Sequence, residues 1–322
     1  MFPAKNALTI CFAHVAYQMQ ERFALRDTGI NAVQVRNRAD LDAAIGQADV
    51  LVVSGLWRNE LVPMAGKLKF IQSIGAGTDQ FSREALSGRG IRLASASGVN
   101  ARAVSEHAMS LILAMARRLP EARDNQHKKF WRGMIGDLSQ REDELGGKTL
   151  IVVGVGRIGG RLAQLAKAFD MHVIAFRRDP AAGTNGADEV YGLDQLPAQL
   201  PRADFVALTC PLTPETEGLI GAVAFAAMKP SSFLINCARG RCVDEAALAV
   251  ALAEKRIAGA GIDVIYEEPL SADSPLWALE NAFITPHTAG ETRRYEDNVI
   301  DILMDNLDRL WRGETALRNQ VV

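Results

Sequence analysis

A run at residues 148–159 constrains the fold of this chain more than any other stretch. Its β-branched segment ends at Val153, and Gly154, Gly156 and Gly159 follow at the spacing G-x-G-x-x-G. The first glycine permits a tight turn, the second lets the backbone approach a pyrophosphate, and the third allows a helix to pack closely on the strand. A helix expected at 161–169 and a strand at 172–176 complete the order typical of a dinucleotide-binding unit. An ordinary glycine turn is the alternative.

Composition excludes several other classes of protein. The 322 residues predict two domains, and the net charge of −2 with a pI near 6.2 gives no reason to expect nucleic acid as a partner. No apolar run approaches the roughly 20 residues of a membrane-spanning helix. The N-terminus is typical of a first strand, not of a signal peptide. The four cysteines show no C-x-x-C spacing, so we expect no disulfide framework, no zinc site and no other metal, but a cytoplasmic protein with reduced thiols.

The first hundred residues alternate short apolar runs with helical patterns. This rhythm predicts a parallel sheet covered on both faces. Expected strands lie at 8–13, 32–35, 49–54, 69–74 and 91–94, and expected helices include 15–27 and 40–45. The loop after the fourth strand contains Gly75, Ala76 and Gly77, whose amides could bind a small anion at the carboxyl edge of the sheet. From these residues alone a simple turn is the favoured explanation.

The rest of the chain repeats the pattern. Apolar spacing predicts a long helix at 101–119 that Pro120 ends, followed by a polar surface arm at 121–147 that could form a subunit contact. Later strands are expected at 205–209, 232–236, 259–263 and 283–285, and a last amphipathic helix at 296–311. We therefore predict an α/β protein with two doubly wound parallel sheets. The substrate domain, flavodoxin-like, comprises 1–100 plus 291–322, and the Rossmann dinucleotide-binding domain comprises 101–290.

Three strand-end loops carry residues suited to catalysis. Arg239 follows one buried strand, Glu267 and Glu268 follow the next, and His287 follows the last. Because such loops meet at the carboxyl edge of a parallel sheet, an arginine, an acid and a histidine could converge there. Arginine binds a carboxylate bidentately, and a neighbouring acid favours the protonated imidazole. His107, inside the long helix, is predicted to make a structural hydrogen bond instead.

The order of these motifs resembles the D-isomer-specific 2-hydroxyacid dehydrogenases. The motifs are G-V-G-R-I-G, P-L-T-P-E-T (211–216), N-C-A-R-G (236–240), D-V-I-Y-E-E-P (263–269) and T-P-H (285–287), with V-N-A-R-A-V-S-E-H (99–107) before them. The resemblance covers residues 70–322, whereas residues 1–65 match the family only in the alternation of strand and helix patterns. It implies hydride transfer between a nicotinamide cofactor and a small 2-oxo or 2-hydroxy acid.

The resemblance also implies a role for individual residues. Arg239 would bind the substrate carboxylate and carbonyl, His287 would exchange the proton, and Glu268 would pair with His287. Formate dehydrogenases of the same superfamily lack an acid at the Glu268 position, which argues against that activity. The loop at Gly75, Ala76 and Gly77 would bind the substrate carboxylate. Cofactor contacts would come from Gly154, Gly156, Arg157, Ile158, Gly159, Arg177, Arg178, Pro211, Thr216, Cys237, Ala238, Asp263, which faces the nicotinamide carboxamide, and Gly290.

One departure from the family pattern concerns the choice of cofactor. Members that use NAD carry an acid after the second strand of the dinucleotide unit, where this chain has Arg177 and Arg178. Two guanidinium groups favour a 2′-phosphate, so we expect NADP(H), with NAD(H) possible if Asp179 binds the ribose instead. The resulting hypothesis is a homodimeric, NADPH-dependent reductase of glyoxylate or hydroxypyruvate. A cofactor-sensing, corepressor-like protein of the same superfamily is the alternative.

Overall fold

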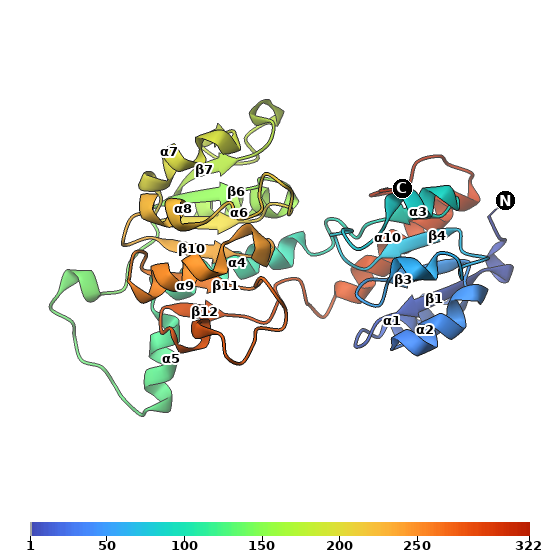
Figure 1. Ribbon diagram of the computed structural model, residues 1–322, viewed down its shortest axis with the longest axis horizontal. Coiled ribbons are helices and arrows are strands. Elements are labelled where there is room, and N and C mark those ends of the chain that lie inside the picture. Colours follow the sequence, from blue (N-terminus) through green and yellow to red (C-terminus); the bar gives the residue numbers. More distant parts are fainter. Residues whose placement is uncertain (1) are drawn as a thin grey trace. The chain divides into compact units, whose positions relative to one another are not determined.

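The computed structural model describes residues 2–322, and the chain divides into two compact units. Unit 1 is Met1–Asn100 with Thr292–Val322, and unit 2 is Ala101–Glu291; only Met1, where the predicted substrate domain begins, lies outside the described residues. Each unit has one parallel sheet, of five strands in unit 1 and seven in unit 2 (Figure 1). The predicted α/β class with two doubly wound sheets is confirmed. Across residues 2–322, no helix is both long and apolar enough to cross a membrane.

Unit 1 has the strand order β2-β1-β3-β4-β5, the flavodoxin-like order. Every residue of β3 and β4 is buried, as expected for parallel strands covered on both faces. The strands are β1 Thr9–Ala13, β2 Asn31–Val35, β3 Val50–Val53, β4 Phe70–Ser73 and β5 Arg92–Ala94; the helices are α1 Met19–Ala24, α2 Arg38–Ala44, α3 Arg83–Gly88 and α10 Tyr295–Trp311, with the 3₁₀ turns η1 Lys5–Ala7, η2 Ile45–Gln47 and η3 Asn59–Leu61.

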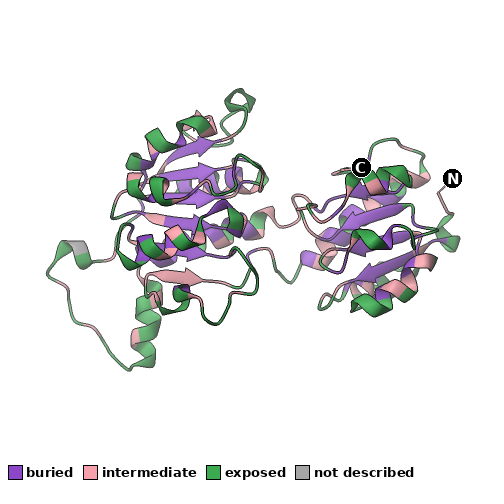
Figure 2. Cartoon of the chain, viewed as in Figure 1, coloured by how far each residue is buried: buried purple, intermediate pink, exposed green. Residues whose placement is uncertain are grey.

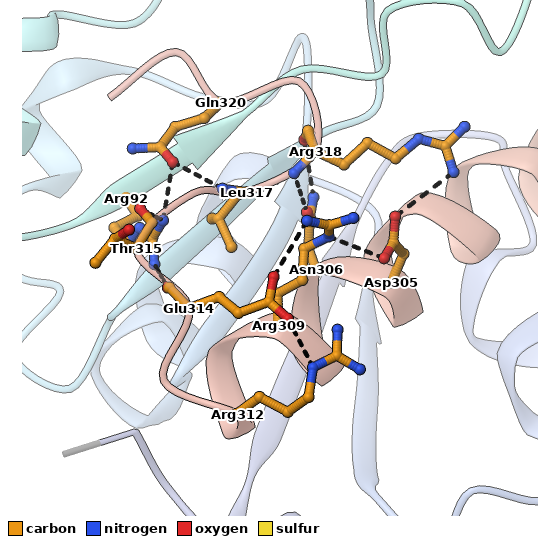
Figure 3. A network of polar contacts seen from close by, with 10 residues as sticks. All are labelled: Arg92, Asp305, Asn306, Arg309, Arg312, Glu314, Thr315, Leu317, Arg318 and Gln320. Carbon is orange, nitrogen blue, oxygen red and sulfur yellow. Dashed lines mark hydrogen bonds and ion pairs between the residues drawn. The ribbon is translucent and has the colours of Figure 1, made fainter.

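The C-terminal segment belongs to unit 1 because polar contacts hold it to the sheet. On α10, the buried Asn306 donates to the Gln72 side-chain oxygen at 3.1 Å and accepts from the Arg318 amide at 2.7 Å. Arg92 of β5 donates to the Thr315 carbonyl and to the Gln320 side chain, both at 2.8 Å (Figure 3). These bonds satisfy buried polar groups that would otherwise cost free energy, and they place the chain end beside β5.

Unit 2 has the order β12-β11-β10-β9-β6-β7-β8, a Rossmann sheet extended by one strand. Hydrophobic clusters cover both faces of the sheet. Figure 2 shows the inner strands largely buried and the outer helix faces exposed, whereas the edge strands β8 and β12 are half-buried. The strands are β6 Thr149–Val153, β7 His172–Phe176, β8 Glu189–Tyr191, β9 Phe205–Leu208, β10 Phe233–Asn236, β11 Gly259–Ile262 and β12 Ala282–Ile284. The helices are α4 Ala101–Ala116, α5 Leu119–His127, α6 Arg157–Ala168, α7 Leu196–Gln199, α8 Ala222–Ala227 and α9 Glu245–Ala253, with 3₁₀ turns η4 Leu138–Gln140, η5 Pro180–Ala182, η6 Leu193–Gln195, η7 Leu200–Arg202, η8 Gly240–Cys242 and η9 Pro275–Ala278.

The predicted end of the long helix at Pro120 is wrong. Helix α4 ends at Ala116, Arg118 adopts a left-handed conformation with φ of 49°, and α5 then begins at Leu119 with Pro120 in its first turn. A proline fits there because the first amides of a helix have no acceptor within the helix. Beyond α5 the chain extends away from the sheet (Figure 1) and exposes 96% of Trp131.

Candidate active site

The glycine loop of unit 2 has the shape that a dinucleotide phosphate requires. Gly154 has a φ of 95°, and a Cβ there would lie 2.6 Å from the Cys210 Cα. At Gly159 a Cβ would lie 2.1 Å from the Gly154 carbonyl oxygen, whereas at Gly156 it would meet nothing within 4 Å. Two glycines thus permit close packing, and the third leaves open space at the start of α6. Since α6 begins at Arg157 rather than at the expected position 161, its unpaired amides point from the loop itself.

The end of β7 carries the two arginines from which the sequence predicted NADP(H). Arg177 is half-buried, and its Nη1 donates to the Gly183 carbonyl at 2.7 Å. Arg178 is exposed; the pKa of Glu215 is lowered, mainly by a hydrogen bond from Thr213 and in smaller part by the charge of Arg178. Arg178 therefore acts on the 211–216 loop. The Asp179 carboxylate accepts from the Ala181 amide at 3.0 Å and caps η5, so one of its oxygens is committed to the turn.

The loops after β9 and β10 form the next part of the predicted cofactor site. Thr216 is buried, and its hydroxyl donates to the Pro211 carbonyl at 2.7 Å while accepting from the Thr213 amide at 2.8 Å. It therefore holds the 211–216 loop in shape. Cys237 and Ala238 are buried at the end of β10. Burial, with a smaller effect of the Asp263 charge, raises the pKa of the Cys237 thiol. A neutral thiol at this place acts as a packing group.

Arg239 follows β10 in a turn that its neighbours hold. The Asn236 side chain donates to the Arg239 carbonyl at 3.2 Å and accepts from the Ala238 amide at 3.1 Å. A Cβ at Gly240 would lie 1.8 Å from the Ile265 carbonyl oxygen, so the backbone after Arg239 lies directly against the loop that follows β11. Arg239 itself is half-buried, with Nη1 donating to the Ala238 carbonyl at 2.8 Å.

Asp263 ties the ends of β11 and β12 together. Its carboxylate is buried; Oδ1 accepts from the Thr285 hydroxyl at 2.6 Å and from the Thr288 amide at 3.0 Å, and Oδ2 accepts from the Ala289 amide at 3.1 Å. These bonds fix the segment that carries His287. Gly290 follows Ala289 directly and therefore lies in the same loop, close to Asp263. His107 of α4 reaches the same group, with Nε2 3.0 Å from the Thr285 hydroxyl.

The predicted acid and histidine meet at this edge of the sheet. The Nδ1 atom of His287 lies 2.6 Å from Oε2 of Glu268, and Oε1 of Glu268 accepts from the Ile265 amide at 3.4 Å. The two side chains are 49% and 39% exposed, so the pair is open to solvent. His287 has a φ of 56°, a conformation that costs energy in a residue other than glycine and occurs at functional sites. With Nδ1 committed to the carboxylate, Nε2 is left to exchange a proton.

The remaining predicted site residues lie in unit 1. The Ser73 hydroxyl donates to the Gly75 carbonyl at 3.0 Å, and the Ala96 amide donates to the same oxygen. Tyr295, the first residue of α10, donates from its hydroxyl to the Ile74 carbonyl at 2.8 Å. The loop before Ala76 and Gly77 is thus held from two sides. Tyr295, like Thr285, received no role from the sequence, since a tyrosine at a helix start carries no motif.

The fold and the site define a nicotinamide-cofactor domain with an acid-paired histidine at its carboxyl edge. Residues 109–289 match the family described as "D-isomer specific 2-hydroxyacid dehydrogenase, NAD binding domain". The chain is 38% identical over 293 residues to a glyoxylate/hydroxypyruvate reductase B of Yersinia pestis, covering 89% of each chain. It is 36% identical over 291 residues to a D-3-phosphoglycerate dehydrogenase of Methanocaldococcus jannaschii, covering 87% of this chain and 53% of that one.

Solved structures agree with the sequence comparison. An NADPH-dependent glyoxylate/hydroxypyruvate reductase of Sinorhizobium meliloti, in complex with NADP and malonate, superposes with a TM-score of 0.82 at 26% identity, covering 98% of this chain and 97% of that one. The chain belongs to the D-isomer-specific 2-hydroxyacid dehydrogenase family of enzymes, which confirms the resemblance. It spans only about half the length of the phosphoglycerate dehydrogenases that it matches.

Proposed function

We propose that the protein reduces a small 2-oxo acid, glyoxylate or hydroxypyruvate, to the D-2-hydroxy acid. The observation that carries the proposal is the 2.6 Å contact between His287 and Glu268 at the carboxyl edge of the dinucleotide-binding sheet. The 38% identity to the glyoxylate/hydroxypyruvate reductase B of Yersinia pestis supports this substrate. The 36% identity to the D-3-phosphoglycerate dehydrogenase of Methanocaldococcus jannaschii makes 3-phosphoglycerate the second candidate.

The side chains divide the work of the reduction among them. When bound, a reduced nicotinamide supplies hydride to the substrate C2. His287 gives the proton on Nε2 to the substrate oxygen, and Glu268 stabilises the imidazolium and fixes the ring through Nδ1. Arg239 holds the substrate carboxylate and polarises the carbonyl. Asp263 receives the nicotinamide carboxamide.

The proposed cofactor is NADPH. Arg177 and Arg178 stand at the end of β7, where an acid would otherwise accept bonds from the ribose hydroxyls, and Asp179 is engaged in capping η5. Their positive charge suits a 2′-phosphate, which a carboxylate would repel. The roles of Gly154, Gly156 and Gly159 at the pyrophosphate do not depend on this choice.

We propose further that a second copy of the chain is the protein's partner. The arm after α5 exposes 59% of Phe130, 96% of Trp131, 102% of Met134 and 75% of Leu138, and exposed apolar groups of this size are typical of interaction surfaces.

Binding of the substrate carboxylate by the backbone amides of Gly75, Ala76 and Gly77 also stays a prediction.

Turnover of a panel of acids with both reduced nucleotides tests the proposed function. We expect glyoxylate and hydroxypyruvate to be reduced with NADPH at a higher kcat/KM than with NADH. Arg177→Asp should reverse that preference, while the same change at Arg256, which is exposed in the turn after α9, should leave it unchanged. A wild-type preference for NADH would refute the cofactor assignment. Oxidation of 3-phosphoglycerate alone would move the substrate to the second candidate, and dinucleotide binding without any turnover would favour the corepressor-like alternative.

Glu268→Gln should lower kcat for reduction about tenfold, while nucleotide affinity stays near wild type. The carboxylate accepts from Nδ1 and fixes the His287 ring, and a hydrogen bond to a charged group is stronger than one to a neutral amide. The partly exposed position keeps the effect modest. The neighbouring Glu267→Gln, also exposed, is the matched control and should turn over as wild type does. An unchanged kcat in Glu268→Gln would contradict the pairing.

A further inference from the structure

A second histidine reaches the strand ends that hold the proposed site. His107 lies on α4, which packs against α6, β10 and β11. Its Nε2 is 3.0 Å from the Thr285 hydroxyl and 3.5 Å from Oδ1 of Asp263. The side chain is 21% exposed, against 2% for Asp263. The predicted structural hydrogen bond of His107 is therefore present, but its acceptor is part of the network around Asp263.

Donor and acceptor chemistry decides where the protons of this network lie. An ionised carboxylate can only accept, so Thr285 donates its one hydroxyl proton to Asp263 at 2.6 Å. The Thr285 oxygen must then accept from His107, which places a proton on His107 Nε2. The result is a directed chain from His107 through Thr285 to Asp263.

Three donors hold the Asp263 carboxylate in its orientation. The Thr288 amide donates to Oδ1 and the Ala289 amide donates to Oδ2. The Thr285 hydroxyl donates the third bond, to Oδ1. Without the His107 donor, the hydroxyl is free to rotate and donate elsewhere, and a buried carboxylate that loses a donor turns toward another. The same segment carries His287 in its left-handed conformation, with a φ of 56°.

We propose that His107 is a positioning residue for the nicotinamide end of the cofactor. Acting through Thr285, it holds Asp263 in the orientation that accepts the carboxamide N–H. The inference rests on the proposed function through the assignment of Asp263 to that carboxamide. If the bond only joined α4 to the segment after β12, its loss would lower folding stability and weaken the binding of every nucleotide ligand equally. If His107 positions Asp263, its loss weakens the binding only of ligands that contain nicotinamide.

Binding measurements with whole and truncated nucleotides separate these two roles. His107→Leu should weaken NADPH binding about tenfold, because the proposed carboxamide bond to the Asp263 carboxylate loses its alignment. Binding of 2′-phospho-ADP-ribose, which lacks nicotinamide, should not change. His107→Gln, whose amide can donate from a similar place, should restore most of the NADPH affinity. Ser110→Ala removes an exposed hydroxyl that donates to the His107 carbonyl rather than to its imidazole, so it is the matched control and should bind both ligands as wild type does. NADH with ADP-ribose serves as the second pair.

Each other outcome overturns the proposal. Equal weakening of NADPH and of 2′-phospho-ADP-ribose would make His107 architectural, and wild-type affinities in His107→Leu would remove it from the site. If His107→Leu does not fold, His107→Phe, which keeps a planar ring but has no donor, replaces it and must show the same selective loss. Failure of the wild-type protein to bind either reduced nucleotide would instead refute the proposed function itself, independently of any variant.

Discussion

His287→Asn lowers kcat for 2-oxo acid reduction by about 10²- to 10⁴-fold at every pH, the usual contribution of a positioned acid or base. Asparagine can keep a hydrogen bond to Glu268 but has no proton to give to the substrate oxygen. Cofactor affinity should stay near wild type, because the contacts proposed for the glycine loop are backbone contacts at Gly154 and Gly156 and do not involve His287. Steady-state kinetics across pH, with nucleotide binding measured separately, check both parts.

His172→Asn is the matched control for that loss. His172 also pairs with a carboxylate, with Nε2 2.6 Å from Oε1 of Glu189, but it begins β7 and so stands at the opposite edge of the sheet from the strand-end loops. Replacing it should leave kcat close to wild type. Normal turnover by His287→Asn would exclude His287 as the proton donor.

Arg239→Lys raises the KM for the 2-oxo acid about 10- to 100-fold and leaves nucleotide affinity unchanged. Lysine keeps the positive charge but loses the two parallel N–H groups that match a carboxylate, and bonds to charged groups are worth about 1.5–3 kcal/mol. The cost falls on substrate binding because the turn itself is held by Asn236, which bonds the Arg239 carbonyl rather than its side chain.

Arg241→Lys provides the comparison for that variant. Arg241 is exposed, pairs with Glu217 at 2.5 Å and lies over the Tyr266 ring, so its replacement should not change the KM. An unchanged KM in Arg239→Lys would remove Arg239 from the substrate site. A KM raised equally in both variants would show a general effect of the η8 segment.

The sequence by itself determined the fold class and the family of this protein. The period of the hydrophobic residues and the spacing of the glycines are local properties, so they predicted β7 correctly at His172–Phe176. Five motifs in order identified a family that the comparisons confirm. The convergence of Glu268 and His287 could be predicted as well, since the carboxyl ends of parallel strands meet at one edge. The assignment of individual residues to substrate and cofactor stays a prediction.

Local pattern was insufficient where distant segments decide the outcome. A proline after an apolar helical pattern usually marks the helix end, but here the left-handed Arg118 turns the chain and Pro120 lies in the first turn of α5. The strand β8 was missed because it has three half-buried residues, and Glu189 among them is held by His172 and Arg202.

Only the tertiary structure connected His107 to the hydrogen-bond network around Asp263. In the sequence, His107 is one polar residue on a helix whose apolar positions alone are periodic, and 178 residues separate it from Thr285. The hydrogen bond exists because α4 packs against β10 and β11. That packing depends on the complementary shapes of two apolar surfaces, which no local sequence pattern indicates. Burial of Asp263 then makes that bond matter, because a carboxylate removed from water depends on every donor around it.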